Sequence, residues 1–272
     1  MSNVIDQLKK VLPDSLVTAI GESRDWMIRL KDWPAATFHP WRRDSVYRLQ
    51  ALRDIHRGKR CFIIGNGPSL KQTDLSRLHH EFTIGMNRFF LAFPELGFQT
   101  TYYLSVNDLV IEQSAAEIQA LQMPCFLSWR ARKWLKPAEN IYFLHTTYTG
   151  AKFAEDIAQR VWEGGTVTYV ALQLAYHLGF QDVILIGVDH NYVTQGKPNA
   201  TVVSEGDDPN HFHPAYFGKG FRWQLPDLES WDRSYAMARH AYECAGRHVF
   251  DATIGGKLQV FPKVAYDSLF GS

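Results

Sequence analysis

From Arg60 onward, short apolar runs alternate along the chain with segments whose apolar residues recur at helical spacing. The short runs predict strands at 61–65, 82–86, 101–106, 124–128, 141–145 and 183–188, with a late strand near 247–250. The helical spacing predicts helices near 73–79, 110–121, 151–161, 165–178 and 229–245. This alternation is typical of an α/β fold, a single Rossmann-like domain with a mostly parallel sheet.

Residues 1–58 have a different pattern, which predicts a helical N-terminal extension ahead of a catalytic domain at 59–272. Basic side chains and three tryptophans interleave on its helical segments, but acidic residues dilute the charge. Two interpretations stay open. The extension packs on the domain or on a partner subunit of a homo-oligomer, or it makes peripheral contact with an anionic membrane surface.

Residues 190–228 are rich in Asn, Gly, Pro, His and Asp, and no long apolar run interrupts them. A loop of this length inside a compact domain usually serves as a lid over an active site or is disordered. We therefore expect a lid loop at 190–228.

The formal net charge of the 272 residues is only +1, which argues against nucleic acid as a partner. Cys61, Cys125 and Cys244 form no paired framework, and the first two lie in apolar runs, which indicates buried thiols in a reducing compartment. The N-terminal residues lack a signal-peptide pattern, and no apolar run approaches the ~18 residues of a spanning helix. We expect a cytoplasmic protein, at the inner face of the cytoplasmic membrane if the extension binds lipid.

The turn after the first predicted strand reads Gly65-Asn66-Gly67-Pro68-Ser69. Two glycines allow a ligand to approach the backbone, and the amide and hydroxyl side chains add polar contacts. In an open α/β sheet this turn lies at the edge where ligands bind, and free N–H groups there favour a phosphate or carboxylate. The spacing matches neither a Walker A loop nor a dinucleotide fingerprint. Gly164-Gly165-Thr166 forms a second such turn before a predicted helix.

Other polar residues follow predicted strands and should reach the same sheet edge. They are Asn87, Asn107 with Asp108, and Asp189 with His190, Asn191 and Tyr192. Because Asp189 follows an apolar strand, its carboxylate must accept hydrogen bonds, either by capping a neighbouring loop or from a ligand.

The predicted lid contains His211 and His213, two residues apart. A histidine with a near-neutral pKa can act as a general base; a structural histidine ranks second and a metal ligand third. Asp207, Asp208 and His190 could add metal ligands, but no zinc-type spacing exists, so no metal site is predicted. Tyr216 and Arg222 could bind a phosphate or a carboxylate.

Together, these motifs resemble those of a known family. The run Ile63 to Leu70 and the run Met86 to Phe89 are similar to the opening of bacterial lipooligosaccharide sialyltransferases. The run from Gly164 through Phe180, followed by the run from Ile184 to Asp189, resembles their second nucleotide-binding turn, helix and strand. The resemblance is closer to the MptE-like family, which includes motility-accessory-factor glycosyltransferases and an archaeal hydroxymethylpterin pyrophosphokinase; 210–217 and 251–258 are also typical of it. It covers roughly 60–264.

The resemblance implies an inverting, sialyltransferase-like transfer of an acidic sugar (sialic acid, Kdo or another nonulosonic acid) from a CMP-sugar to a glycan hydroxyl, in lipopolysaccharide or capsule biosynthesis. His211, favoured over His213, would be the base, and Asn107 would lie beside the donor. Tyr192 and Tyr216 are candidates to hold the leaving phosphate, although their spacing departs from the family's tyrosine pair. The residues implied to bind nucleotide are Gly65, Asn66, Gly67, Pro68, Ser69, Asn87, Gly164, Gly165, Thr166, Asp189 and Tyr192.

No cofactor is required for that reaction. The alternative is a pyrophosphokinase acting on a hydroxymethylpterin, which needs Mg²⁺ with ATP and carboxylates such as Asp108, Asp189 and Asp207. A third interpretation is a non-catalytic nucleotide-sugar-binding component of a glycan-assembly complex.

Overall fold

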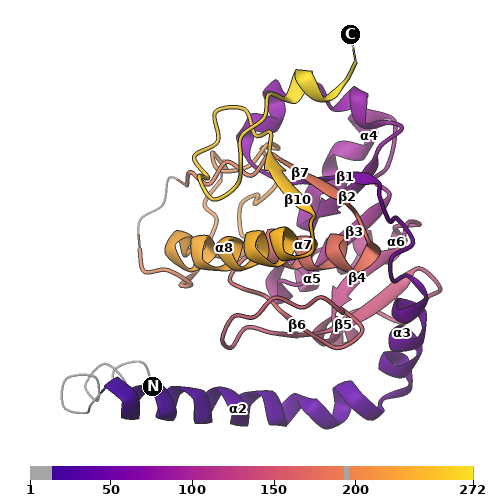
Figure 1. The fold of residues 1–272 in the computed structure, drawn as a ribbon. Helices are drawn as coiled ribbons and strands as arrows, with labels where there is room; N and C mark the ends of the chain where they lie inside the picture. The colour runs from indigo at the N-terminus through magenta and orange to yellow at the C-terminus, as the bar shows by residue number, and fades with distance from the viewer. Residues whose placement is uncertain (1–13, 193–195, 207, 272) are drawn as a thin grey trace.

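A computed structural model describes residues 14–192, 196–206 and 208–271, and shows an eight-stranded parallel sheet in the order β10-β7-β1-β2-β3-β4-β5-β6 (Figure 1). The strands are β1 (Arg60–Ile64), β2 (Phe82–Met86), β3 (Tyr102–Ser105), β4 (Cys125–Ser128), β5 (Ile141–Thr147), β6 (Arg160–Trp162), β7 (Asp182–Ile186) and β10 (His248–Asp251). The seven predicted strands are confirmed. The sequence analysis missed β6 and the antiparallel pair β8 (Thr201–Val203) and β9 (Arg222–Gln224), which lies within the predicted lid.

Helices flank the sheet on both faces. They are α2 (Asp14–Phe38), α3 (Pro40–Ala51), α4 (Phe93–Leu96), α5 (Asp108–Gln113), α6 (Ala115–Ala120), α7 (Val167–Leu178) and α8 (Leu228–Cys244). Short 3₁₀ helices cover Pro68–Gln72, Leu75–Leu78, Asn87–Ala92, Trp129–Lys133 and Tyr266–Leu269. The predicted helices 165–178 and 229–245 are confirmed within two residues at each end.

The side chains of β1 alternate between two cores, as the period of a strand requires. Cys61 and Ile63 pack in the cluster that contains α7 and α8, which lie together on one face in Figure 1. Phe62 and Ile64 pack on the other face, against the 3₁₀ helices and the C-terminal segment. Because both faces are covered, the central strands are almost wholly apolar. The thiols of Cys61 and Cys125 are buried, as predicted, and Cys244 is exposed.

The predicted helix at 151–161 is wrong. This segment is irregular up to β6, although Ala154 and Ile157 are buried at helical spacing. Its backbone groups bond to side chains of other elements instead. Gln173 of α7 accepts from the Ala154 N–H at 3.0 Å, and Arg42 of α3 donates to the Ala158 carbonyl at 2.6 Å. Tertiary hydrogen bonds therefore replace those of a local helix.

Two other predicted helices are shorter than expected. The segment 73–79 forms only the 3₁₀ turn Leu75–Leu78, which Asp74 caps by accepting from the Ser76 N–H at 3.2 Å. The segment 110–121 divides into α5 and α6 at Ser114, whose φ of −125° and ψ of 24° are not helical. Asp74 thus fixes where the first turn begins, whereas the Ser114 hydroxyl between α5 and α6 has no hydrogen-bond partner among the described residues.

Helix α2 runs beneath the rest of the molecule as an arm, and α3 connects it to the sheet (Figure 1). Arg48 of α3 donates to the Ile141 carbonyl at 2.7 Å, and Ser45 accepts from the Phe143 N–H at 3.0 Å. The helical character predicted for the N-terminal extension is therefore present from Asp14 on, whereas the apolar residues 4–12 lie outside the described residues. The boundary between residues 58 and 59 stays a prediction.

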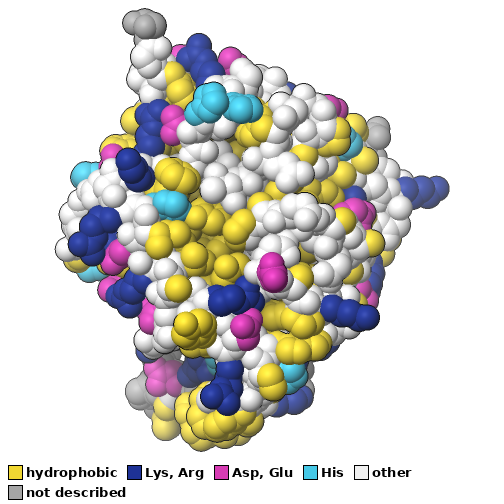
Figure 2. All heavy atoms as spheres, turned by 90° about the vertical axis from the view of Figure 1, so that its right-hand side faces the viewer, with side chains coloured by type: hydrophobic (Ala, Val, Ile, Leu, Met, Phe, Trp, Pro, Cys, Tyr) yellow, Lys and Arg dark blue, Asp and Glu magenta, His cyan; other side chains and the backbone are white. Residues whose placement is uncertain are grey.

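The arm exposes large apolar side chains. On α2 these are Leu16, Ile20, Trp26, Met27, Leu30, Trp33 and Phe38. Figure 2 shows hydrophobic side chains at the lower end of the molecule, where α2 lies, with basic and acidic side chains among them. Within the described ranges, every helix is too short or too polar to cross a bilayer.

Candidate functional site

A cavity of about 1020 Å³ opens at the carboxyl edge of the sheet. The chain leaves β1 toward β2 on one side and returns as β7 on the other, so the strand order reverses between β1 and β7. Ligands of open α/β sheets bind outside the strand ends at such a switch point. The turns after β1, β2, β3 and β7 all line this cavity, which confirms that the predicted polar strand ends meet at one edge.

The turn after β1 rests directly on the turn after β7. The N–H groups of Gly65 and Gly67 donate to Ile186 and Gly187 at 2.7 and 2.9 Å. A Cβ atom at residue 65 would lie 2.1 Å from the Gly187 carbonyl oxygen, and one at 67 would lie 1.9 Å from an Asp189 carboxylate oxygen. Only glycine fits at either position, so the two turns form one main-chain floor.

Asp189 holds this floor in place. Its carboxylate accepts from the Ser69 N–H at 3.1 Å and from the Ser69 hydroxyl at 2.7 Å. Burial raises the pKa of Asp189, while the bonds from Ser69 act in the opposite direction. Of the two interpretations left open, loop capping is therefore present, and Asp189 also lines the cavity. Pro68 and Ser69 support the turn without being among the described lining residues.

Asn66 contributes an unused acceptor. Its side chain is 9% exposed, and its Oδ1 atom is buried without a hydrogen-bond partner among the described residues. A buried acceptor in this state costs about 1–3 kcal/mol, which a donor on a ligand or water can recover. The Asn66 carbonyl accepts from the Phe212 N–H at 2.9 Å, which connects the floor to the predicted lid.

The second glycine turn forms the opposite wall. Gly164 and Gly165 have φ values of 56° and 82°, which favour glycine. The Ser234 hydroxyl of α8 donates to the Gly164 carbonyl at 2.8 Å. Thr166 then caps α7, and the first turn of this twelve-residue helix lines the cavity. The helix dipole favours an anionic ligand there, although Thr166 Oγ1 already accepts from the Thr168 N–H at 3.3 Å.

Asn87 and Asn107 line the cavity but are engaged in local structure. Asn87 adopts a left-handed conformation with φ of 52°, and its Oδ1 accepts from the Ser105 hydroxyl at 3.0 Å. Asn107 is the N-cap of α5, because its Oδ1 accepts from the Leu109 N–H at 2.9 Å. Asn87 Oδ1 is therefore bonded to the end of β3, and Asn107 Oδ1 is bonded to the start of α5.

His211 lies in the cavity wall with a fixed orientation. Its Nδ1 is 2.7 Å from Asp208 Oδ2, and the two side chains are 8% and 5% exposed. The imidazole stacks on the Tyr216 ring with 4.0 Å between centroids and 8° between planes. Asp208 thus favours the tautomer with a proton on Nδ1, so Nε2 is the atom suited to accept a proton.

His213 has a different position. It is not among the described lining residues, and its Nδ1 accepts from the Ala215 N–H at 3.1 Å. Arg222 lies on β9, where it pairs with Glu112 at 2.7 Å, and it too is not among those lining residues. Of the two histidines, His211 is the one that the structure places at the cavity.

Tyr192 and Tyr216 both line the cavity near His211. Burial raises the pKa of Tyr216 far above its ordinary value, so its hydroxyl stays protonated and can donate a hydrogen bond. Arg88, which follows β2, donates hydrogen bonds to the carbonyls of Ala215 and Tyr216. These bonds hold residues 215–216 of the predicted lid at the end of β2.

Sequence reasoning missed Arg130, a cation in the same cavity. Its Nε lies 2.8 Å from Asp108 Oδ1 and its Nη2 lies 2.7 Å from Glu163 Oε1. Burial acts to lower the pKa of Arg130, but Glu163 and Asp108 outweigh it and raise the pKa above its ordinary value. Arg130 lies two residues beyond the predicted strand 124–128, so the expectation that polar residues after strands reach one sheet edge applies to it as well.

Among the residues described, no group of three or more His, Cys, Asp or Glu side chains is arranged to hold a metal ion. Asp207, one of the carboxylates considered for a metal, lies outside the described residues.

These features define an α/β protein with a glycine-walled ligand cavity at the switch point of a parallel sheet. The profile of the MptE-like family, described as 6-hydroxymethylpterin diphosphokinase MptE-like, matches residues 42–195, and the chain belongs to this family. The predicted family and α/β fold class are thus confirmed. The match begins within α3, ahead of residue 60, and ends before the late part of the lid.

Two solved structures are similar to this chain. The MAf glycosyltransferase from Magnetospirillum magneticum AMB-1 has 17% sequence identity and a TM-score of 0.49, over 84% of this chain and 39% of that one. This chain therefore spans well under half the length of that protein. The sialyltransferase CstII from Campylobacter jejuni, solved with cytidine-5'-monophosphate, has 15% identity and a TM-score of 0.42, over 77% of this chain and 86% of that one. No curated protein matches the sequence significantly.

Proposed function

We propose that this protein is an inverting glycosyltransferase that transfers an acidic sugar from a CMP-sugar to a hydroxyl group of a glycan. The observation that carries the proposal is the meeting of two glycine turns and a buried Asp–His pair around one cavity. Its volume of about 1020 Å³ is at the upper end of ordinary ligand pockets and suits a nucleotide sugar with room for an acceptor.

The cytidylate would occupy the floor and the second turn. Asn66 Oδ1 offers an unused acceptor to an amino or hydroxyl group of the nucleotide. The phosphate would lie near the first turn of α7, where N–H groups favour negative charge. Asn66 Oδ1 has no hydrogen-bond partner among the described residues, so that contact would cost no bond within them.

In the chemical step, His211 Nε2 would remove the proton of the acceptor hydroxyl as its oxygen attacks the anomeric carbon. A new glycosidic bond forms while the bond from that carbon to the phosphate oxygen breaks, and CMP leaves with the electron pair. Asp208 would stabilise the imidazolium that results, since its carboxylate lies beside Nδ1. N–H groups at the glycine turns would stabilise the departing phosphate, and the protonated Tyr216 hydroxyl could assist.

The description of the family supports a second candidate, diphosphate transfer from Mg²⁺-ATP to a hydroxymethylpterin. That reaction needs free carboxylates for the metal. Asp108 is bound by Arg130 and Asp189 by Ser69, so these side chains fit a magnesium site poorly. The residues therefore favour glycosyl transfer.

A thermal-shift comparison of CMP, UMP, GDP and ATP, each with and without Mg²⁺, tests the proposal. We expect CMP to raise the melting temperature without magnesium. Stabilisation by ATP alone, and only with Mg²⁺, would instead support the diphosphokinase. Tight CMP binding without transfer or hydrolysis of any CMP-sugar would support the non-catalytic interpretation.

A further inference from the structure

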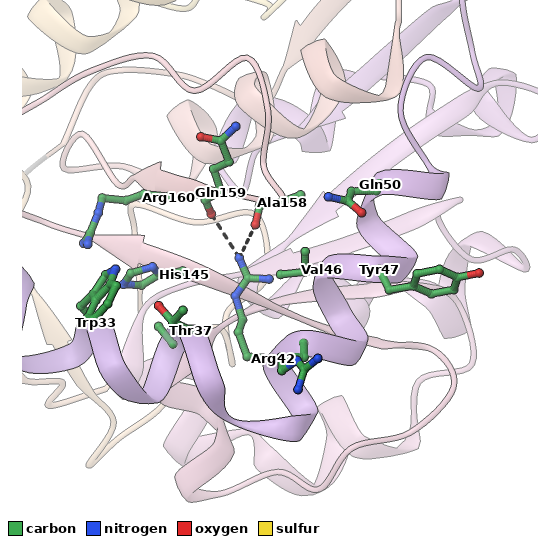
Figure 3. A pocket seen from close by; sticks show the side chains of 12 residues that line it. Trp33, Thr37, Arg42, Val46, Tyr47, Gln50, His145, Ala158, Gln159 and Arg160 are labelled. Atoms are coloured by element: carbon green, nitrogen blue, oxygen red, sulfur yellow. Dashed lines mark hydrogen bonds between the residues drawn. The ribbon is translucent and has the colours of Figure 1, made fainter.

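A second cavity, of about 480 Å³, lies between the end of α2, helix α3 and strands β5 and β6, and it shares no lining residue with the cavity at the sheet edge. Figure 3 shows Trp33 and Thr37 from α2, Arg42, Val46 and Tyr47 from α3, and His145 and Arg160 from the sheet around it. The proposed transferase reaction makes no use of these residues.

The charges in this wall have one sign. Arg42, Arg43 and Arg160 line the cavity together with His145, and none of the described lining residues is acidic. Neither Arg43 nor Arg160 forms a salt bridge or side-chain hydrogen bond with a residue that the structure describes. Asp156 acts electrostatically on Arg42 and Asp32 acts on Arg160, and neither carboxylate is among the described lining residues.

Arg42 fixes the geometry of the wall. It is 2% exposed, and its Nη2 donates to the carbonyls of Ala158 and Gln159 at 2.6 and 3.1 Å, as Figure 3 shows. Its Nε and Nη1 atoms, and Nε2 of the 8% exposed His145, have no hydrogen-bond partner among the described residues. Buried polar atoms are normally paired, so three such atoms in one wall mark an incomplete site.

The arginines of this wall also act on His145. Burial, and then Arg160 and Arg42, lower the pKa of His145 to about 3, so this ring is neutral at pH 7. Burial lowers the pKa of Arg42 to about 10. A bound anion would favour the charged form of Arg42, which burial disfavours.

We propose that this cavity binds the phosphate group of a ligand, held by Arg43 and Arg160 over the buried charge of Arg42. Guanidinium groups pair with phosphate oxygens through two parallel bonds, and several of them around one site suit a tetrahedral dianion. Trp33 and Tyr47 flank the site and offer aromatic surface to the remainder of the ligand. The phosphate could belong to a soluble ester or to a phospholipid headgroup, since apolar side chains of α2 lie exposed beside the site.

Titration calorimetry with inorganic phosphate at constant ionic strength tests the site in the full chain. The double variant Arg43→Gln/Arg160→Gln should bind at this site about tenfold more weakly or worse, because charge-assisted hydrogen bonds are lost. Arg57→Gln is the matched control, since Arg57 is exposed elsewhere and pairs with Asp54. Arg42 stays unchanged in every variant, so that its hydrogen bonds to the loop at 158–159 persist.

Flotation with vesicles of phosphatidylcholine, alone or with phosphatidylglycerol, distinguishes the two sources. Binding only to the anionic vesicles, lost in the double variant, would identify a lipid headgroup. Phosphate binding in solution without vesicle binding would identify a soluble ester. Equal phosphate affinity in wild type and double variant, or no phosphate binding by either together with unchanged vesicle binding, would overturn the proposal.

Discussion

The two cavities of this protein differ in whether the charged side chains of their walls are paired. At the sheet edge, Arg130 pairs with Asp108 and Glu163, and Asp189 accepts hydrogen bonds from Ser69. In the cavity beside α2, three arginines share a wall that has no described acidic lining residue. In the first wall the charged side chains are paired, so the proposed phosphate would meet main-chain N–H groups there. In the second wall the arginines have no acidic partner in the lining, so a phosphate would meet guanidinium groups.

The largest expected effect concerns His211, the proposed general base in the sheet-edge cavity. His211→Ala should lower kcat of sugar transfer by about 10²–10⁴-fold, the usual contribution of a positioned base, with CMP affinity nearly unchanged. Steady-state kinetics together with CMP titration measure both quantities. His80→Ala, on an exposed histidine, is the control. Full activity of the His211 variant would refute the assignment.

Neutralising one arginine in each cavity tests the comparison most directly. Arg130→Gln leaves two partly exposed carboxylates without their cation and should lower the free energy of unfolding by about 1–3 kcal/mol. Arg160→Gln removes an unpaired charge and should change the free energy of unfolding by no more than about 0.5 kcal/mol. Urea denaturation measures both. A comparable loss in the two variants would show that charge pairing does not distinguish the cavities.

The main-chain floor of the sheet-edge cavity should not tolerate a side chain. In Gly65→Ala the new methyl group would meet the Gly187 carbonyl, so we expect a loss of about 1–3 kcal/mol and weakened CMP binding. Gly21→Ala provides the control, because a Cβ there meets nothing within 4 Å and alanine favours a helix. Thermal unfolding with and without CMP measures both effects. An unchanged Gly65 variant would mean that the two turns can separate freely.

The smallest effect concerns pH. Burial raises the pKa of Asp189 above 3.8 in the folded state, so the folded protein holds this proton more tightly than the unfolded chain. Stability contributed by Asp189 therefore falls as pH rises from about 3.8 through the raised pKa. Asp189→Asn lacks this dependence, so its stability relative to wild type should increase over that interval. Parallel unfolding curves from pH 3 to 7 test this, and a relative stability that decreases would contradict the raised pKa.

Sequence reasoning succeeded where a local pattern decides the structure. The apolar run of β2 and the polar residues after the strands needed no distant partner to be recognised. It failed where a distant side chain decides. Gln173 and Arg42 bind the backbone at 154–159 and prevent a helix that the spacing of Ala154 and Ile157 favours. Likewise, the pairing of Arg130 with Glu163 joins residues 33 positions apart, which no local motif reveals.

The contact between Gly65 and Gly187 has a consequence for how this scaffold can diversify. Because the bottom of the sheet-edge cavity consists of peptide groups in direct contact, point mutations have no side chain there to exchange. New substrate preferences must then arise through the surrounding walls, from positions such as Asn66, Tyr192 and the β8–β9 hairpin. Related chains that handle different substrates should therefore share the bottom and differ at the rim.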